Sequence, residues 1–166
     1  MNVPCLTSAL RGSGWLPAVA SVLAWAVGCA APAEAPVEGP SERAVLLTDA
    51  LRWYAPTVLG DRDLAEWLLI VDAGVDSPTI AQRMGHPAFT VTVPTDVEKG
   101  ALYTTDRQTG RHVMRFNLKV EAVSESSATV VVCFYSGSRS ASGSRLELVP
   151  EAEGWRVVSA EELWGA

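Results

Sequence analysis

The sequence predicts an α+β fold in which N-terminal helices pack on one face of a curved antiparallel β-meander of about four strands. Two observations carry this prediction. Apolar residues recur at spacings of three and four over residues 41–54, as in a helix with one apolar face. From residue 111 onward, apolar and polar residues alternate in segments that end at short turns, which is typical of consecutive antiparallel strands.

The first helix is expected to begin at Ser41 and to end near Tyr54. The Ser41 side chain can accept a hydrogen bond from the first helical turn, so it is a suitable N-cap residue. Pro56 disfavours a helical conformation in the residue before it, which is why the helix is expected to stop there. The apolar face is too wide for a helix surrounded by water, so the helix should lie on a sheet.

Three shorter elements are expected between this helix and the meander. The apolar run at residues 67–71 predicts a short buried strand, and periodicity alone leaves an inner helical turn as the alternative. Ser77 and Pro78 open a short helix that should end at about Met84. Residues 89–93 alternate apolar and polar side chains and therefore predict an edge strand.

The last third of the chain carries the strands of the meander. Residues 111–124 alternate strictly, so this strand should have one dry and one wet face. Residues 128–135 are richer in Val and aromatic residues and predict a central strand. The small residues at 136–143 predict a flexible connector, and residues 145–149 and 155–158 predict the last two strands.

The last fifth of the chain has a pattern of turn and core positions at Tyr135, 141–143, Leu146, Leu148, Val149, 154–157 and Trp164. This pattern resembles that of small exported bacterial proteins with the nuclear-transport-factor-2-like cone fold. The resemblance implies helices packed on a curved sheet that can enclose a cavity. It implies no particular activity, because the cone fold serves enzymes, binding proteins and scaffolds alike.

Residues 1–28 have the features of a secretory leader. Arg11 and the amino terminus supply positive charge, an apolar run covers residues 18–27, and small residues precede Cys29. Two alternatives stay open. The run could be an uncleaved membrane helix, although a span needs about 20 apolar residues, or an ordinary signal peptide that is cut near residues 31–33.

The tetrapeptide Ala26-Val27-Gly28-Cys29 resembles the lipobox of bacterial lipoproteins. The resemblance implies that the Cys29 sulfur is diacylglycerated, that the chain is cut just before it, and that the exported protein is anchored by lipid in the cell envelope. Lipoproteins that stay in the inner membrane usually carry Asp after this cysteine, so Ala30 favours the outer membrane. An anchor of two or more acyl chains is a stable one.

Three regions follow from these features. Residues 1–28 form the signal peptide, residues 29–40 form the lipidated cysteine and a tether rich in Pro, Ala and Glu, and residues 41–166 form a single α+β domain. The tether lacks the apolar residues that a core requires, so it should hold the domain away from the membrane. It spans about 3 Å per residue where proline keeps it extended.

Composition argues against several classes of function. The 166-residue chain has a net charge of −6, which argues against a nucleic-acid partner and against electrostatic binding to anionic lipid headgroups. Loss of Cys5 with the leader and acylation of Cys29 would leave Cys133 alone, so Cys133 is expected to be a buried, inert thiol. The sequence contains neither a zinc-type set of Cys and His nor a calcium loop, so no metal and no cofactor are expected.

No residue is predicted to be catalytic. His86 and His112 are the only histidines in the sequence, and their spacing places neither of them beside a carboxylate. Trp53, Tyr54, His86 and Tyr135 are the candidate lining residues of a pocket, because aromatic and amphipathic side chains commonly line small-molecule sites.

The anchor, the tether and the small acidic domain together favour a membrane-tethered, non-catalytic binding or accessory lipoprotein of the bacterial envelope. Its partner would be a second envelope protein. Two alternatives stay open: a small-molecule binder or enzyme that uses a cone cavity, and a purely structural envelope lipoprotein.

Overall fold

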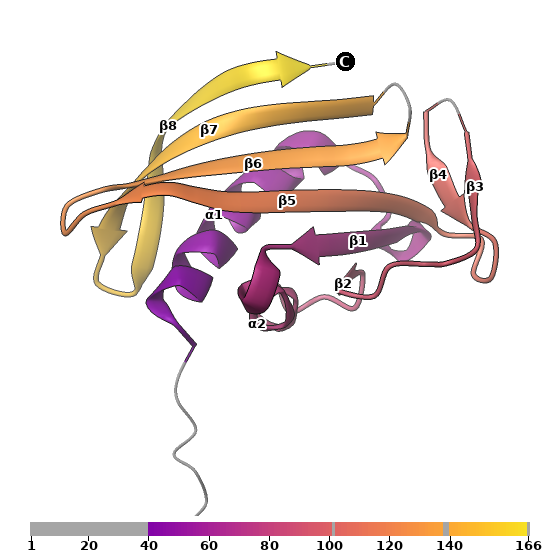
Figure 1. Cartoon of the computed structure of the whole chain (residues 1–166), viewed down its shortest axis with the longest axis horizontal. Coiled ribbons are helices and arrows are strands. Elements are labelled where there is room, and N and C mark those ends of the chain that lie inside the picture. The colour runs from indigo at the N-terminus through magenta and orange to yellow at the C-terminus, as the bar shows by residue number, and fades with distance from the viewer. Residues whose placement is uncertain (1–39, 101, 138–139, 166) are drawn as a thin grey trace, which may run out of the picture. The chain divides into compact units, whose positions relative to one another are not determined.

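A mixed β-sheet of eight strands organises the chain, and one long helix lies across one of its faces (Figure 1). The computed structural model describes residues 40–100, 102–137 and 140–165. Of these described residues, 49% lie in strands and 25% in helices. The predicted signal peptide, the lipobox and all of the tether before Pro40 lie outside the described residues.

Helix α1, Glu42–Leu59, begins where it is predicted to begin but ends later. The Ser41 side chain caps it by accepting a hydrogen bond from an amide of the first turn at 3.0 Å, which confirms the predicted N-cap. The predicted end near Tyr54 is wrong, since the helix continues through Pro56 to Leu59. The last turn buries Leu59 in the core, and this burial offsets part of the roughly 3 kcal/mol that an interior proline costs.

The next part of the chain contains two strands and a short helix: β1 (Trp67–Asp72), α2 (Ser77–Arg83) and β2 (Phe89–Thr90). The 3₁₀ turn η1 (Leu64–Glu66) precedes β1, and the 3₁₀ turn η2 (Gly74–Asp76) precedes α2. β1 is a strand as predicted, and it pairs in parallel with both β2 and β5. Two consecutive parallel strands require a crossover connection, and α2 lies in the one between β1 and β2. β2 is the edge strand expected in this region, although only two residues of it are paired.

Strands β3 (Val97–Lys99) and β4 (Thr104–Asp106) form a short antiparallel arm. β4 also pairs with the beginning of β5, where Thr104 lies opposite Val113. This pairing attaches the arm to one end of the sheet (Figure 1). The sequence predicts no strand in this region, because each strand of the arm is only three residues long and shows no period.

Strands β5 (His112–Val123), β6 (Ala128–Gly137), β7 (Ser140–Glu151) and β8 (Gly154–Gly165) are consecutive antiparallel neighbours. β5 and β6 lie where the alternation predicts strands. The expected connector at residues 136–143 is wrong, because its described residues belong to the end of β6 and the beginning of β7. The final strand is also longer than predicted, since β8 continues to Gly165.

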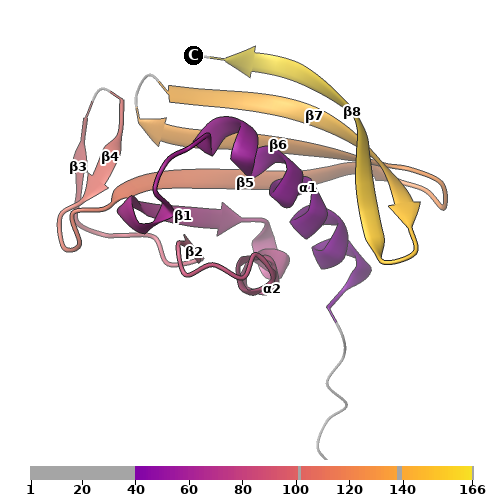
Figure 2. The same ribbon diagram turned by 180° about the vertical axis from the view of Figure 1, so that it is seen from behind.

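The core lies between α1 and the sheet face that this helix covers (Figure 2). Successive side chains of a strand point to opposite faces, so Met114, Phe116 and Leu118 of β5 enter the core. The helix and the strands contribute the fully buried side chains Leu46, Leu47, Leu51, Leu69, Met114, Phe116, Val130, Val132, Leu146 and Leu148. On the other face, no helix covers β5, β6 and β7 in Figure 1.

The predicted fold class is wrong. The sheet has eight strands instead of about four, it is mixed instead of antiparallel, and the N-terminal half contributes strands to it as well as helices. The physical reason is the pairing of β1 with β5. Strand direction within a sheet depends on partners that are distant in sequence, here Ile70 and Arg115, and local periodicity carries no information about it.

Candidate functional site

A half-open groove of about 680 Å³ lies on the sheet face opposite α1. Strands β1, β5 and β6 form its floor, and the segment before β3 together with the arm forms its wall. The lining residues are Ile70, Val93, Pro94, Val97, Lys99, Thr104, Val113, Arg115, Asn117, Tyr135, Ser136 and Gly137. This volume falls within the range of small-molecule sites, which is roughly 300–1,000 Å³.

The alternation of β5 places the floor of the groove. Met114 and Phe116 face α1 and are buried. Val113, Arg115 and Asn117 alternate with them along the strand, so these three side chains face the groove. β1 lies beside β5 in parallel register. The floor therefore combines apolar and polar side chains from two strands that lie far apart in the sequence.

A close backbone approach holds the arm over the floor. A Cβ atom at Gly137 would lie 2.5 Å from the carbonyl oxygen of Leu102, so only glycine allows the end of β6 to come this near the β3–β4 turn. The Ser136 hydroxyl donates a hydrogen bond to the same carbonyl at 3.3 Å. Val97 and Lys99 line the groove from β3, while Glu98 between them forms an ion pair with Arg107.

The groove is positively charged. Lys99 and Arg115 both line it, and no Asp or Glu stands among its described lining residues. Within the described part of the chain, neither cation forms an ion pair or donates a side-chain hydrogen bond. Since the whole chain has a net charge of −6, the groove differs in sign from the protein that carries it.

Asn117 brings an unsatisfied polar atom to the floor. Its Oδ1 atom is buried and has no hydrogen-bond partner among the described residues. A buried amide oxygen without a donor costs about 1–3 kcal/mol, and most native proteins satisfy such atoms. Asn117 lines the groove, but this oxygen is itself closed to solvent, so a bound molecule with an N–H or O–H group would reach it only after the amide turned toward the groove.

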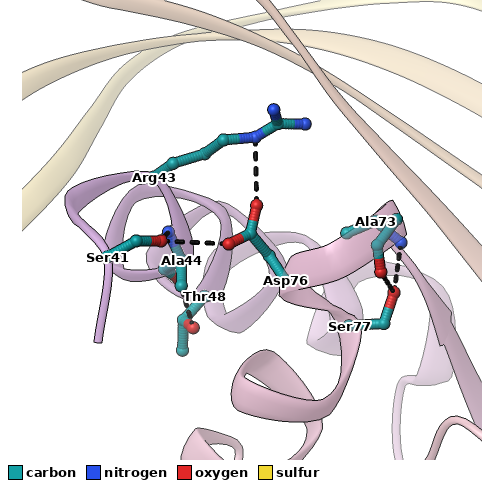
Figure 3. Close-up of polar contacts among 8 residues, drawn as sticks. Ser41, Arg43, Ala44, Thr48, Ala73, Asp76 and Ser77 are labelled. Atoms are coloured by element: carbon teal, nitrogen blue, oxygen red, sulfur yellow. Dashed lines mark hydrogen bonds and ion pairs between the residues drawn. The ribbon is translucent and has the colours of Figure 1, made fainter. Parts of the chain in front are cut away.

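A second hollow of about 320 Å³ adjoins the groove and shares Ile70, Val93 and Arg115 with it. Its lining includes the exposed carboxylate of Asp72, which forms no ion pair with Arg115. Ser77 also lines this hollow, but its hydroxyl is already engaged: it donates to the Gly74 carbonyl and accepts from the backbone amide of residue 73, each at 2.8 Å (Figure 3). Arg115 thus stands where the two hollows meet.

The structure does not bring the four predicted pocket residues together. Tyr135 lines the groove and is 41% exposed. Trp53 lies on α1, away from this groove, with 43% of its surface exposed.

The other two are also placed elsewhere. Tyr54 is buried in the core, where its ring meets Phe116 edge to face and its hydroxyl bonds Ser142 at 2.9 Å. Burial raises the pKa of Tyr54 above its usual value, more than the Ser142 hydroxyl lowers it. His86 is exposed in a turn, and its Nδ1 atom accepts a hydrogen bond from the backbone amide of residue 88 at 3.1 Å.

Sequence reasoning missed Lys99, Arg115 and Asn117. The alternation of β5 assigns Arg115 and Asn117 to a wet strand face, and polar residues on such a face ordinarily contact water. Nothing in the sequence indicated that the arm covers this end of the strand. The one feature of the sequence that could have indicated the site is the placement of Arg115 and Asn117 two residues apart, on a strand face that also carries Val113.

The two histidines lie in separate environments. His112 stacks near Trp67 and Tyr103, with ring centroids 5.2 and 5.0 Å away, and its Nδ1 atom lies 3.3 Å from the Thr105 hydroxyl. Within the described ranges, no group of three or more His, Cys, Asp or Glu side chains could hold a metal ion. Cys133 is half-buried instead of fully buried, and burial raises the pKa of its thiol.

Comparison of the chain with protein-family models, with curated proteins and with solved structures finds no match. In the part of the chain that the structure describes, no helix is long and apolar enough to cross a membrane.

Proposed function

We propose that this chain is a lipid-anchored protein of the bacterial envelope that binds a small molecule in the groove without transforming it. The observation that carries the proposal is the groove itself. It has the size of a ligand site, an apolar floor, two cations and a buried amide oxygen that lacks a partner. These are the features by which a pocket binds and orients a molecule.

The residues of the groove favour binding over catalysis. Its described lining contains neither a histidine nor a carboxylate, which are the groups that most often serve as general acid and base. The tyrosine and the serine there have no adjacent base that would activate them as nucleophiles, and Ser136 already donates its hydrogen bond to a backbone carbonyl.

The location in the envelope is supported by the sequence of residues 18–29. The short apolar run and the small residues before Cys29 resemble a lipoprotein signal. We expect mass spectrometry of the native protein to find a mature chain that begins at an acylated Cys29. A Cys29→Ser variant should leave the membrane fraction. Recovery of native protein with an unmodified Cys29 would contradict the anchor and leave the groove untouched.

Filling the groove tests the binding function. Small molecules would be screened by thermal shift against the native protein, and hits would be repeated on Thr104→Trp, which places an indole in the groove. A true ligand at 100 times its Kd stabilises the native protein by about 2.7 kcal/mol, a shift of several degrees in Tm. The shift should disappear in Thr104→Trp.

The control is Lys119→Trp, which adds the same ring to an exposed position of β5 outside the groove. It should keep the full shift. Hits that stabilise Thr104→Trp as much as the native protein would show that binding takes place elsewhere. A broad screen without any hit would contradict the binding function.

A further inference from the structure

We propose that the occupant of the groove is an organic anion with an apolar body: a carboxylate or phosphate monoester head held by Arg115 and Lys99, and a hydrocarbon part lying against the floor. This inference rests on the proposed function and names its ligand class. Three observations support it: the positive charge of the groove, its apolar lining residues, and the absence of ion pairs at Lys99 and Arg115 within the described part of the chain.

The head group is assigned to Arg115. Arg115 lines both hollows and is partly buried, so an anion bound to it would be partly shielded from water. A guanidinium binds a carboxylate or a phosphate through two parallel hydrogen bonds, and the binding is strongest where water is excluded. Other described arginines, including Arg43, Arg52, Arg107, Arg145 and Arg156, already form ion pairs.

Lys99 adds the second charge from the arm. Lys99 is exposed and lies on β3, which β4 joins to the strand that carries Arg115. Two cations that face one cavity repel each other, and an anion between them removes that repulsion. Because Lys99 is on the arm and Arg115 is on the floor, a bound head group would also join the wall of the groove to its floor.

The apolar body is assigned to the floor and the wall. Val93 is 49% exposed and lines the groove together with Pro94 and Val97, while Ile70 and Val113 are almost fully buried in the floor. Hydrocarbon placed there gains about 25 cal/mol for each Å² removed from water. A free inorganic anion would leave this surface unused.

The orphan oxygen of Asn117 argues for a polar occupant of the floor. It lies two residues along β5 from Arg115, a separation of roughly 7 Å in a strand. A ligand that bears a hydroxyl or amide N–H beside its anionic head would satisfy this atom once the Asn117 amide turns toward the groove.

Calorimetry with matched eight-carbon probes tests the assignment. The lipidated protein in nanodiscs would be titrated with octanoate, octyl phosphate, octylammonium and 1-octanol, with empty nanodiscs as the blank for partitioning. Octanoate and octyl phosphate should bind the native protein at least tenfold more tightly than octylammonium and 1-octanol. The difference between the two anions identifies the preferred head group.

Two charge-neutralising variants with matched controls locate the head group. Arg115→Met and Lys99→Met should each weaken the binding of octanoate about tenfold or more, since each removes a charged hydrogen bond, and should leave 1-octanol unchanged. Arg156→Met and Lys119→Met remove charges outside the groove and should leave all affinities unchanged. Because Lys99 is exposed, Lys99→Met should fold normally, so the test can still be read if Arg115→Met does not fold.

The outcomes separate this inference from the proposed function. Equal binding of octylammonium or 1-octanol would overturn the anionic ligand, and so would an unchanged octanoate affinity in Lys99→Met and folded Arg115→Met. If no probe binds but a screened ligand is still lost in Thr104→Trp, the ligand class is wrong and the binding function stands. If Thr104→Trp loses no ligand either, both proposals fail.

Discussion

Replacing Asp76 by Ala is expected to lower the free energy of unfolding by about 2–3 kcal/mol, because this side chain fastens the first turn of α1 to the segment before α2. Its Oδ1 atom accepts a hydrogen bond from the Ser41 hydroxyl at 3.0 Å, and its Oδ2 atom lies 3.1 Å from the Arg43 Nε atom (Figure 3). Asp76 is 8% exposed, so most of this arrangement is shielded from water.

Three contributions make up the expected loss, and the removal of the Asp76 Oδ2 atom, which is buried and accepts no hydrogen bond, offsets part of their sum. The hydrogen bond from Ser41 to an ionised carboxylate is worth about 1.5 kcal/mol. The carboxylate lies beside the N-cap of α1, where a negative charge contributes about 0.3–1 kcal/mol. The Arg43 side chain is 57% exposed, so its ion pair adds only about 0–1 kcal/mol.

Urea denaturation of a small set of variants separates these contributions. Asp76→Asn keeps an oxygen for the Ser41 hydroxyl and loses the charge, so it should cost about 1 kcal/mol. Arg43→Met should cost less than about 1 kcal/mol, and its effect should vanish in 0.5 M NaCl because salt screens exposed charges. Ser41→Ala should cost about 1–2 kcal/mol, since it removes both the cap of α1 and the bond to Asp76.

A double-mutant cycle decides whether Ser41 and Asp76 act through each other. The cost of the combined Ala variant should fall short of the sum of the single costs by about 1 kcal/mol, because both single variants remove the same hydrogen bond. Strict additivity would refute the coupling. An Asp76→Ala cost below about 0.5 kcal/mol, or one equal to that of Asp76→Asn, would refute the assignment of stability to this contact.

Three further perturbations test other parts of the structure. Gly137→Ala should cost about 1–3 kcal/mol and speed hydrogen exchange of the arm amides, since its Cβ would meet the Leu102 carbonyl at 2.5 Å. The Thr109 hydroxyl and nearby backbone amides hold the pKa of Asp106 below its usual value, so the stability from this carboxylate is present above about pH 4 and is lost as the pH falls through the lowered folded value. Thr109→Val should raise that pKa, which an NMR titration of the carboxyl carbon would measure. Burial raises the pKa of Tyr54, so the folded state should lose stability as the pH rises above about 10, and Tyr54→Phe should reduce that loss in alkaline unfolding curves.

Sequence patterns correctly predicted those helices and strands whose conformation depends mainly on their own residues. Ser41 caps α1 because a hydroxyl beside free amides needs no distant partner. β5 and β6 lie where the alternation and the apolar run predict them, since each is long enough for its pattern to be read. The end of α1 could not be predicted in this way, because the burial of Leu59 against the rest of the core outweighs the local preference of Pro56.

The groove illustrates the other limit. Arg115 on an alternating strand has the same sequence signature whether its face meets water or a ligand. What distinguishes the two cases is the arm, whose strands are too short to be recognised and whose position depends on pairing between Thr104 and Val113. The end of β6 also approaches the arm closely, which only a glycine at position 137 permits. A candidate site assembled in this way, from contacts between segments that carry no local signal, becomes visible only when all of them are placed together.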